Sequence, residues 1–502
     1  MSAGARPIGH RVPAARRRVA TIDFRPIFFV IGYMLLVLAG AMILPALVDA
    51  GAHHPDWQGF LASAAITAFV GGALVVTNQV ERPRITVREG FVLTTLSWAA
   101  MCAFGALPFL FSNLNLRYAD AYFETMSGLT TTGSTVIVGL DHAPPGILLW
   151  RGLLQGIGGL GIVAMAVIML PFLRIGGMQL FRTESSDRSE KVLPRPAEIA
   201  KAIGAVYLTL IGLCTILLWV SGMNLLEATT HAMAAIATGG FSTSDDSVAH
   251  FKSPLIDWIL IVFMAAGALP MLWFFRVARG EYAELWRDSQ VRNFLAMLTA
   301  ICLAVTLYRW ATSETPFWDA LRLASFNVVS VVTTTGFATT DYTQWGGFVN
   351  VVFLFITFLG GCSGSTAGGI KMFRLEVMAI TMRFYLRRLL QPRGIFNRTY
   401  DRAPLTDDVV LSVLGFTGMY MATFLVLSAL VALTGLDFIT SISSVAECMG
   451  NVGPGLGPIV GPAGNFSTLS DPAKWVLSFA MLVGRLELFT VYVLFLPRFW
   501  RD

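Results

Sequence analysis

Four short segments, each centred on glycine, interrupt the apolar stretches of this sequence and are its clearest candidates for chemistry. They are Thr131-Thr132-Gly133-Ser134, Thr238-Gly239-Gly240-Phe241, Thr334-Thr335-Gly336-Phe337 and Asn451-Val452-Gly453-Pro454. The segments recur roughly every 100 residues, and recurrence at a near-constant period indicates an internal repeat. One Thr-Thr-Gly stretch is typical of an ordinary turn, but four phased copies favour a shared function.

Segments of this kind can offer backbone carbonyl oxygens to a bare cation. A ring of carbonyls can replace the hydration shell that an ion loses when it leaves water. Glycine adopts positive φ freely and has no Cβ to obstruct the ion, and threonine hydroxyls can add further oxygens. The residues predicted to form a cation filter are Thr131, Thr132, Gly133, Thr238, Gly239, Gly240, Thr334, Thr335, Gly336, Asn451, Val452 and Gly453.

The composition places these segments in a membrane protein. The 502 residues are 55% hydrophobic and 13% charged, with a mean hydropathy of +0.66, whereas soluble domains carry about 25% charged residues. A net charge of +5 could suggest nucleic-acid binding, but the arginines stand at the ends of apolar stretches. We therefore expect them to set the membrane topology, and we expect membrane lipid rather than nucleic acid as a partner.

Ten apolar stretches are long enough to cross a bilayer as helices. They fall near 26–49, 59–80, 90–112, 146–172, 198–222, 254–276, 292–311, 347–380, 407–434 and 474–497. Lysine and arginine concentrate in alternate loops, and such loops are typically cytoplasmic. This pattern predicts that both termini are cytoplasmic. Short helices, too short to cross, are expected near 120–130, 227–237, 318–332 and 438–449, each just before a glycine-centred segment.

The sequence therefore predicts an all-α polytopic membrane protein with fourfold pseudosymmetry. Four pseudo-repeated units of helix, pore helix, filter loop and helix would surround one central pore, with two extra N-terminal transmembrane helices outside the pattern. Each pore helix would point the negative end of its dipole at the pore, which favours a cation. The predicted divisions are a basic cytoplasmic N-terminus at 1–25, two extra transmembrane helices at 26–88, and pore repeats at 89–175, 197–280, 291–395 (with a broken second helix) and 405–502.

A glycine-rich run inside the span 347–380 predicts a broken helix. Glycine costs a helix about 1 kcal/mol per residue, and a helix broken at mid-membrane is typical of a functional site. We expect a flexible loop that opens or blocks the pore, formed by Gly360, Gly361, Ser363, Gly364, Ser365, Thr366, Gly368 and Gly369.

Two other motif interpretations compete for this run. The stretch 361–364 matches the GxSG motif of rhomboid-type intramembrane proteases, but such an enzyme needs a neighbouring histidine, and His231 lies in a predicted pore helix. A phosphate-binding loop is excluded because Ile370 stands where that motif requires lysine. We therefore expect no enzyme, and no covalent or organic cofactor.

Arg485 is a charged residue inside the last predicted span. A cation inside a span is costly and should face protein or water. One hypothesis is a structural ion pair with Glu447 or Glu124. The other is a positive charge at the pore that limits how long an ion stays. The sequence leaves both hypotheses open.

These motifs resemble those of the superfamily of K+ transporters that comprises the Trk, Ktr and plant HKT proteins. The resemblance covers nearly the whole chain from about residue 25, and the two extra N-terminal spans are similar to the Trk type. It rests on the four glycine-centred segments, on Gly360 to Lys371 and on Gly484-Arg485-Leu486-Glu487. In that family serine in place of the first filter glycine accompanies Na+ transport, so glycine at all four positions resembles the K+-selective branch.

The resemblance implies K+ uptake across the cytoplasmic (inner) membrane, with K+ held by the filter residues. A Na+-coupled or Na+-conducting relative is the alternative, and an intramembrane protease is the alternative of another class. It also implies a homodimer and a cytosolic nucleotide-binding ring protein that regulates it. The basic stretch 371–402, which follows the glycine-rich run directly, would transmit force from that partner to the loop.

Overall fold

The chain folds as a helical membrane protein in a computed structural model that describes residues 22–80, 85–169, 196–281, 288–401 and 403–501. Within these ranges, seven helices are long and apolar enough to span a membrane, and two bent helix pairs raise the total to nine. The expected all-α membrane architecture is confirmed. The remaining predicted span, 347–380, is interrupted.

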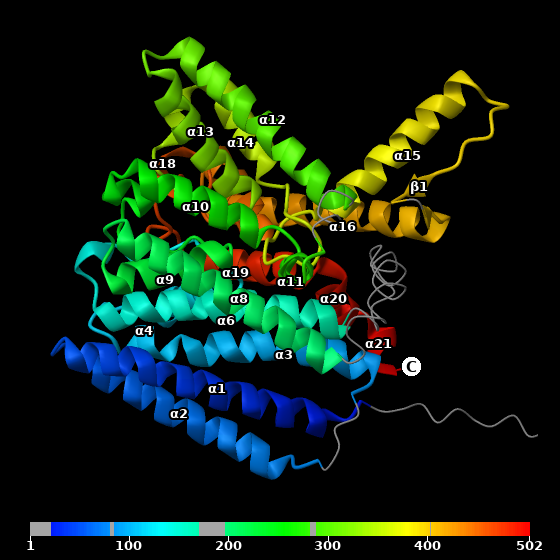
Figure 1. The fold of residues 1–502 in the computed structure, drawn as a ribbon. Helices are drawn as coiled ribbons and strands as arrows, with labels where there is room; N and C mark the ends of the chain where they lie inside the picture. Colours follow the sequence, from blue (N-terminus) through cyan, green and yellow to red (C-terminus); the bar gives the residue numbers. More distant parts are fainter. Residues whose placement is uncertain (1–21, 81–84, 170–195, 282–287, 402, 502) are drawn as a thin grey trace, which may run out of the picture.

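The two N-terminal helices form a hairpin at one edge of the molecule (Figure 1). Helices α1 (Phe24–Gly51) and α2 (Trp57–Thr77) pack along each other, and α1 also contacts α3 and α6. A Cβ on Gly32 would lie 2.8 Å from the carbonyl oxygen of Gly71, and a Cβ on Gly71 would lie 2.9 Å from that of Gly32. Small residues at such a crossing let two membrane helices approach closely.

The remaining chain forms four successive sets, each with a long helix, a short helix, an extended segment and a second helix. Set one contains α3 (Val87–Gly105), α4 (Leu107–Phe111), α5 (Tyr118–Leu129), η1 (Leu140–His142) and α6 (Pro145–Met169). Set two contains α8 (Pro196–Val220), α9 (Leu225–Ile236), η2 (Ser247–Phe251), α10 (Pro254–Gly267) and α11 (Met271–Ala278). Set three contains α12 (Ser289–Thr312), α13 (Phe317–Val332), η4 (Tyr342–Trp345), α14 (Gly347–Ile356) and α15 (Met372–Leu390). Set four contains α16 (Asp407–Ala432), α17 (Phe438–Gly450), α18 (Gly457–Val460), α19 (Asp471–Arg485), α20 (Leu488–Tyr492), η5 (Val493–Phe495) and α21 (Pro497–Arg501).

Two spans predicted as continuous helices, 254–276 and 474–497, are bent sharply, and that part of the prediction is wrong. Helices α10 and α11 meet at 100°, and α19 meets the α20–η5 stretch at 113°. Pro270 has no N–H for the helical ladder, and it precedes α11 with an extended ψ of 127°. Glu487 adopts φ of +59°, which ends the helical path before α20.

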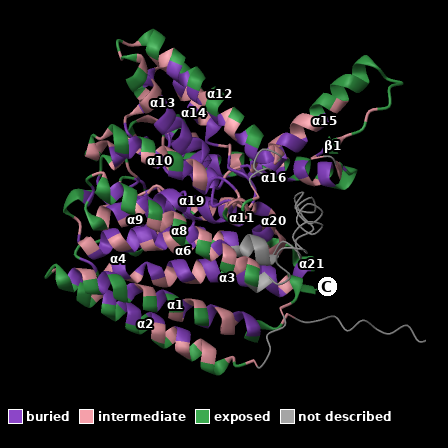
Figure 2. Cartoon of the chain, viewed as in Figure 1, coloured by how far each residue is buried: buried purple, intermediate pink, exposed green. Residues whose placement is uncertain are grey.

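The interruption predicted in the span 347–380 is present. Helix α14 ends at Ile356, and the non-helical stretch 357–371, here called the glycine loop, leads to α15. The far end of α15 projects away from the bundle and is largely exposed (Figures 1 and 2). The chain returns to α16 through a two-stranded antiparallel pair, β1 (Thr399–Tyr400) and β2 (Ala403–Pro404), in which Tyr400 faces Ala403.

Some predicted features lie outside the described residues. They are positions 1–21 of the basic N-terminus, Arg82 and Arg84, the basic loop from Arg174 to Arg195, Arg287 and Arg402. The described ends of the chain, at α1 and α21, lie at the same end of the bundle (Figure 1). This placement agrees with termini on one side of the membrane.

Candidate functional site

The four glycine-centred segments share one backbone conformation. The residue two positions before each central glycine is not glycine, yet it has a left-handed φ of 51° to 59°; these residues are Thr131, Thr238, Thr334 and Asn451. The central glycines also have positive φ, at 92° for Gly133, 76° for Gly240, 89° for Gly336 and 106° for Gly453. Left-handed residues other than glycine are uncommon, so the same strained pattern four times marks a site that the surroundings hold in place.

Each segment caps the short helix that precedes it in the same way. The residue between the left-handed residue and the central glycine donates its backbone N–H to a carbonyl five residues earlier. These bonds run from Thr132 to Ser127 (2.8 Å), from Gly239 to Ala234 (2.7 Å), from Thr335 to Ser330 (2.8 Å) and from Val452 to Glu447 (3.0 Å). A carbonyl at a helix C-terminus is left without a partner unless such a bond supplies one. The cap directs the next carbonyls away from the helix.

The segments touch one another in cyclic order. A Cβ on any central glycine would lie closer than van der Waals contact to the carbonyl oxygen of the residue before the central glycine in the next set. Gly133 lies against Gly239, Gly240 against Thr335, Gly336 against Val452, and Gly453 against Thr132. The last contact returns to set one. These four carbonyl oxygens, here called the carbonyl ring, therefore belong to a closed circle of segments.

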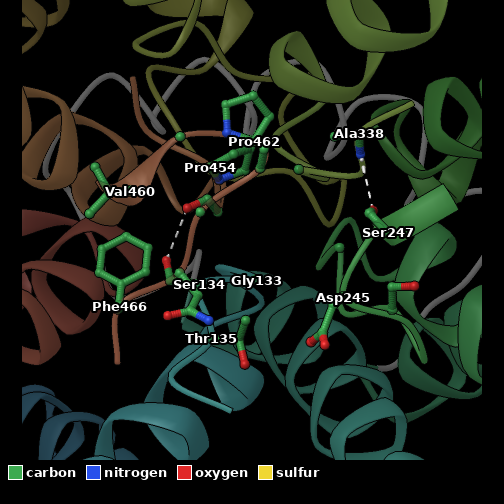
Figure 3. Close-up of a pocket in the computed structure, with 18 of the residues that line it drawn as sticks. Gly133, Ser134, Thr135, Asp245, Ser247, Ala338, Pro454, Val460, Pro462 and Phe466 are labelled. Atoms are coloured by element: carbon green, nitrogen blue, oxygen red, sulfur yellow. Dashed lines mark hydrogen bonds between the residues drawn. The ribbon is translucent and has the colours of Figure 1, made fainter. Parts of the chain in front are cut away.

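A cavity of about 420 Å³ lies on this circle and is lined by all four central glycines. Figure 3 shows Phe466 and Val460 on one side of the cavity and Asp245 and Ser247 on the other. Ser247 accepts a hydrogen bond from the Ala338 amide (3.1 Å), which links sets two and three across the rim. The sequence predicted the four glycines as one site, and the structure brings them together.

Each set has a buried polar residue nine positions before its central glycine. The sequence analysis did not identify these four residues as a group. These residues are Glu124, His231, Asn327 and Ser444, and all four are fully buried. Three contact the chain that follows their own segment: Glu124 accepts from the Val136 amide (2.9 Å), His231 Nε2 contacts Ser242 Oγ (3.0 Å), and Asn327 Nδ2 donates to Thr339 Oγ1 (2.9 Å). Aligning the repeats on glycine would have shown a polar residue at this fixed position. Ser444 instead donates to Ser441 within its own helix (3.3 Å).

Two side chains of α6 bind the segment of set two. Arg151 is buried, pairs with Glu124 through Nε (2.8 Å), and donates from Nη1 to the carbonyl of Ser242. Gln155 donates to the carbonyl of Gly239 (2.5 Å) and accepts from the Phe241 amide (3.1 Å). The guanidinium of Arg151 also lies 4.1 Å from the centre of the Phe241 ring. These contacts hold set one against set two.

The glycine loop lies against the C-terminal ends of three short helices. Thr366 Oγ1 donates to the carbonyls of Ile236 (2.8 Å) and Gly267 (2.9 Å). The Gly368 amide donates to Thr334 Oγ1 (2.7 Å), and a Cβ on Gly368 would collide with the carbonyl of Gly450. The loop thus contacts sets two, three and four directly beside their glycine-centred segments.

The two ends of the glycine loop are held together. Leu359 and Ile370 form a parallel bridge. The Gly360 amide donates to Ile370 (3.0 Å), and the Met372 amide donates to Gly361 (3.1 Å). The loop between these bonds therefore starts and ends at neighbouring positions.

Arg485 makes neither of the ion pairs considered from the sequence. Glu124 pairs with Arg151, and Glu447 accepts from Ser134 and from the amide of Gly453. Arg485 is 4% exposed, and among the described residues its Nε and Nη2 have no hydrogen-bond partner. Glu487 pairs instead with Arg374 of α15 (2.6 Å).

The protease interpretation also lacks its catalytic pair. His231 contacts Ser242 and the carbonyl of Glu227 (2.9 Å). The Ser363 amide donates to Gln290 (3.2 Å), and the Ser363 hydroxyl has no partner among the described residues. A serine nucleophile needs a base within hydrogen-bond reach, and His231 is engaged elsewhere.

Comparisons with known proteins by sequence and by structure agree on one family. Residues 57–501 match the TrkH family, described as a cation transport protein. The chain is 44% identical to the Trk system potassium uptake protein TrkI of Halomonas elongata, over 95% of this chain and 97% of that protein. It is 37% identical to TrkH of Escherichia coli, over 96% of this chain and 100% of that protein. The fold is similar to the crystal structure of the potassium transporter TrkH from Vibrio parahaemolyticus, with a TM-score of 0.88, 36% identity, and coverage of 96% of this chain and 100% of that chain.

Proposed function

This chain belongs to the TrkH family of cation transport proteins, and from that premise we propose that it takes up K+ across the cytoplasmic membrane through a K+-selective pore. The observation that carries this proposal is the closed circle of four glycine-centred segments around one cavity. The names of its relatives, which are potassium uptake proteins, support K+ as the transported ion.

In this proposal the four central glycines and the residues before them form the selectivity filter. The carbonyl ring at Thr132, Gly239, Thr335 and Val452 replaces part of the ion's hydration shell. The four short helices end at this ring, and each contributes roughly half a negative charge there. The strained left-handed residues fix the carbonyl directions before the ion arrives, so little reorganisation is needed.

The glycine loop is the proposed gate of this pore. Its contacts with the C-terminal ends of three short helices support a position directly below the filter. The residues between Leu359 and Ile370 can move while these two residues stay paired. Arg485, buried and without a pairing carboxylate among the described residues, would add a positive charge near the same pathway and shorten ion occupancy.

The proposed assembly is a homodimer with cytoplasmic termini, regulated by a cytosolic nucleotide-binding ring. The exposed end of α15 supports a docking role because it carries Arg387 and Arg388 beside exposed Leu389 and Leu390. Force applied there would reach the glycine loop directly, since α15 begins where that loop ends.

Ion flux into liposomes tests the proposed function. The purified chain is reconstituted first without and then with the cytosolic ring protein. It should admit K+ and Rb+ in preference to Na+. Equal entry of Na+ and K+ would favour a Na+-conducting relative instead. Peptide cleavage without ion flux would overturn the transport proposal and support the protease.

A further inference from the structure

Glu447 is a fully buried carboxylate that touches the filter itself. Its Oε2 accepts from the amide of Gly453 (3.2 Å) and from the hydroxyl of Ser134 (2.9 Å). Its Oε1 accepts from the thiol of Cys448 (3.0 Å). Gly453 belongs to the filter segment of set four and Ser134 to that of set one, so one carboxylate joins the two segments that close the circle. Figure 3 shows Ser134 directed from set one toward set four.

This carboxylate breaks the repeat pattern. The positions equivalent to Glu447, six residues before the central glycine, hold Ser127, Ala234 and Ser330 in the other sets. Set four is also the one in which the buried residue nine positions before the glycine, Ser444, does not reach the chain after its segment. In set four α17 reaches the following chain through Ser443, which donates to the carbonyl of Leu456 (3.2 Å), and Glu447 adds a bond to the segment itself and a carboxyl group that a serine or alanine would not supply.

The charge of Glu447 has no protein counter-charge in the described part of the chain. No Lys, Arg or His side chain there lies within salt-bridge distance of its carboxylate, whereas Glu124 of set one is paired with Arg151 at 2.8 Å. Its three donors are neutral groups, and the nearby helix C-termini carry partial negative charge. A buried carboxylate is costly unless an opposite charge compensates it. Burial favours the neutral form of such a group unless an opposite charge stays beside it, so an ionised Glu447 requires the transported cation as its counter-charge.

We propose that Glu447 is a specificity-determining residue of the cation pathway, whose carboxylate supplies fixed negative charge at the junction of the fourth and first filter segments and raises cation occupancy there. The inference rests on the proposed function, because it assigns the compensating charge to an ion held at the carbonyl ring. The ligand class is a monovalent cation without its full hydration shell.

The expected size of the effect follows from electrostatics. At an effective dielectric constant of about 20, a unit charge ~10 Å from a cation changes its binding constant by about tenfold. Glu447 is hydrogen-bonded to Gly453, the neighbour of the ring residue Val452. Removal of the charge should therefore raise the K+ concentration for half-maximal flux by about tenfold, with less change in the maximal rate.

Glu447→Gln tests the charge while keeping an amide oxygen that can still accept from Gly453. The first measurement is Rb+ uptake into liposomes across a range of K+ concentrations. The second is the thermal midpoint of the detergent-purified chain as a function of K+ concentration. Two matched variants accompany it. Glu227→Gln makes the same change at the outer end of α9, where the side chain caps the Asn224 amide (3.0 Å), and should leave half-saturation unchanged. Ser134→Ala removes the hydroxyl that contacts both Glu447 Oε2 (2.9 Å) and the carbonyl of Gly453 (3.2 Å) but removes no charge, and should shift half-saturation by less than about threefold.

The outcomes separate the two proposals. An intact chain that carries no K+ contradicts the proposed function. An intact chain that carries K+ while Glu447→Gln keeps wild-type half-saturation overturns the role of Glu447. Equal shifts in Glu447→Gln and Ser134→Ala also overturn it, because they assign the effect to hydrogen bonding. If Glu447→Gln does not fold, Glu447→Asp keeps the charge and should remain within about threefold of the intact chain; a larger shift contradicts the proposal.

Discussion

The glycine-centred segments of the four sets have nearly identical backbone conformations, whereas the second helices of the sets all differ. Each segment has a left-handed residue at the same position, a positive-φ glycine two residues later and the same capping bond. The second helix is continuous in set one (α6), bent at 268–270 in set two, interrupted by the glycine loop between α14 and α15 in set three, and bent beside Glu487 in set four. One chain thus combines symmetric glycine-centred segments with asymmetric second helices.

The difference indicates two kinds of requirement. A carbonyl ring can surround an ion evenly only if all four backbones take the same path, so deviation in one segment is costly. In the proposed function, opening and closing need an element that can move, and the interrupted helix of set three would supply it. The side chains that brace the segments vary freely because only the backbone they hold must be equal.

The largest effect is expected from a side chain placed in the ring. Gly133→Ser puts a Cβ against the carbonyl of Gly239, whereas Gly139→Ser, also at positive φ (79°), meets no atom within 4 Å. Overpacking costs about 1–3 kcal/mol, so the K+/Na+ permeability ratio of Gly133→Ser should fall by about 10- to 100-fold. Gly139→Ser carries the same backbone strain and serves as the control. Equal K+/Na+ ratios in the two variants would remove the filter assignment.

Removal of the glycine loop should have the next largest effect. Deletion of 362–369 joins Gly361 to Ile370, which the structure already holds close together through Leu359 and Met372. Without the loop, K+ flux should rise by about tenfold and lose its dependence on the regulatory partner. Flux assays with and without that partner measure both changes. A deleted chain that still responds to the partner as the intact chain does would show that the loop is not the gate.

Arg485→Ala should raise K+ flux several-fold with little loss of stability. No carboxylate among the described residues pairs with this guanidinium, so its removal orphans no partner. The matched variant is Arg374→Ala, which leaves Glu487 without its 2.6 Å partner and should lower the thermal midpoint. Thermal unfolding and Rb+ uptake distinguish the two roles. Unchanged flux in a well-folded Arg485→Ala chain would end the functional interpretation.

The smallest effect is expected from the braces. Asn327→Ala removes the hydrogen bonds that join α13 to Thr339 and should destabilise the chain by about 1–3 kcal/mol. Ser444→Ala removes a bond within one helix and should cost less than about 1 kcal/mol. Thermal unfolding of both variants tests this order. The reverse order would show that the buried residue nine positions before the glycine does not brace its segment.

The sequence predicts the symmetric part of the fold better than the asymmetric part. The glycines at 133, 240, 336 and 453 recur because positive φ and close contact leave no other residue, and such a requirement is visible in a repeat. The bend at Pro270 had a sequence signal that was not used, since proline ends helices. The bend at Glu487 had none, because a positive φ in a glutamate depends on tertiary contacts.

The pairing of buried charges could not be predicted from residue types alone. One of the two hypotheses for Arg485 pairs it with Glu124 or Glu447, but Glu124 is paired with Arg151 of α6. Arg151 itself lies inside a predicted span and is an intramembrane charge of the kind that marks functional sites. Which carboxylate meets which guanidinium depends on how helices from different sets pack, and sequence spacing does not contain that information.

In the proposed function, the symmetric carbonyl ring selects the ion and the asymmetric glycine loop controls its passage. The most direct test is the reversal potential of the 362–369 deletion with K+ on one side of the membrane and Na+ on the other. The account predicts that the deleted chain conducts more but keeps the K+/Na+ permeability ratio of the intact chain, because the four glycine-centred segments are unchanged. A ratio that collapses as the flux rises would contradict it and make the glycine loop part of the filter.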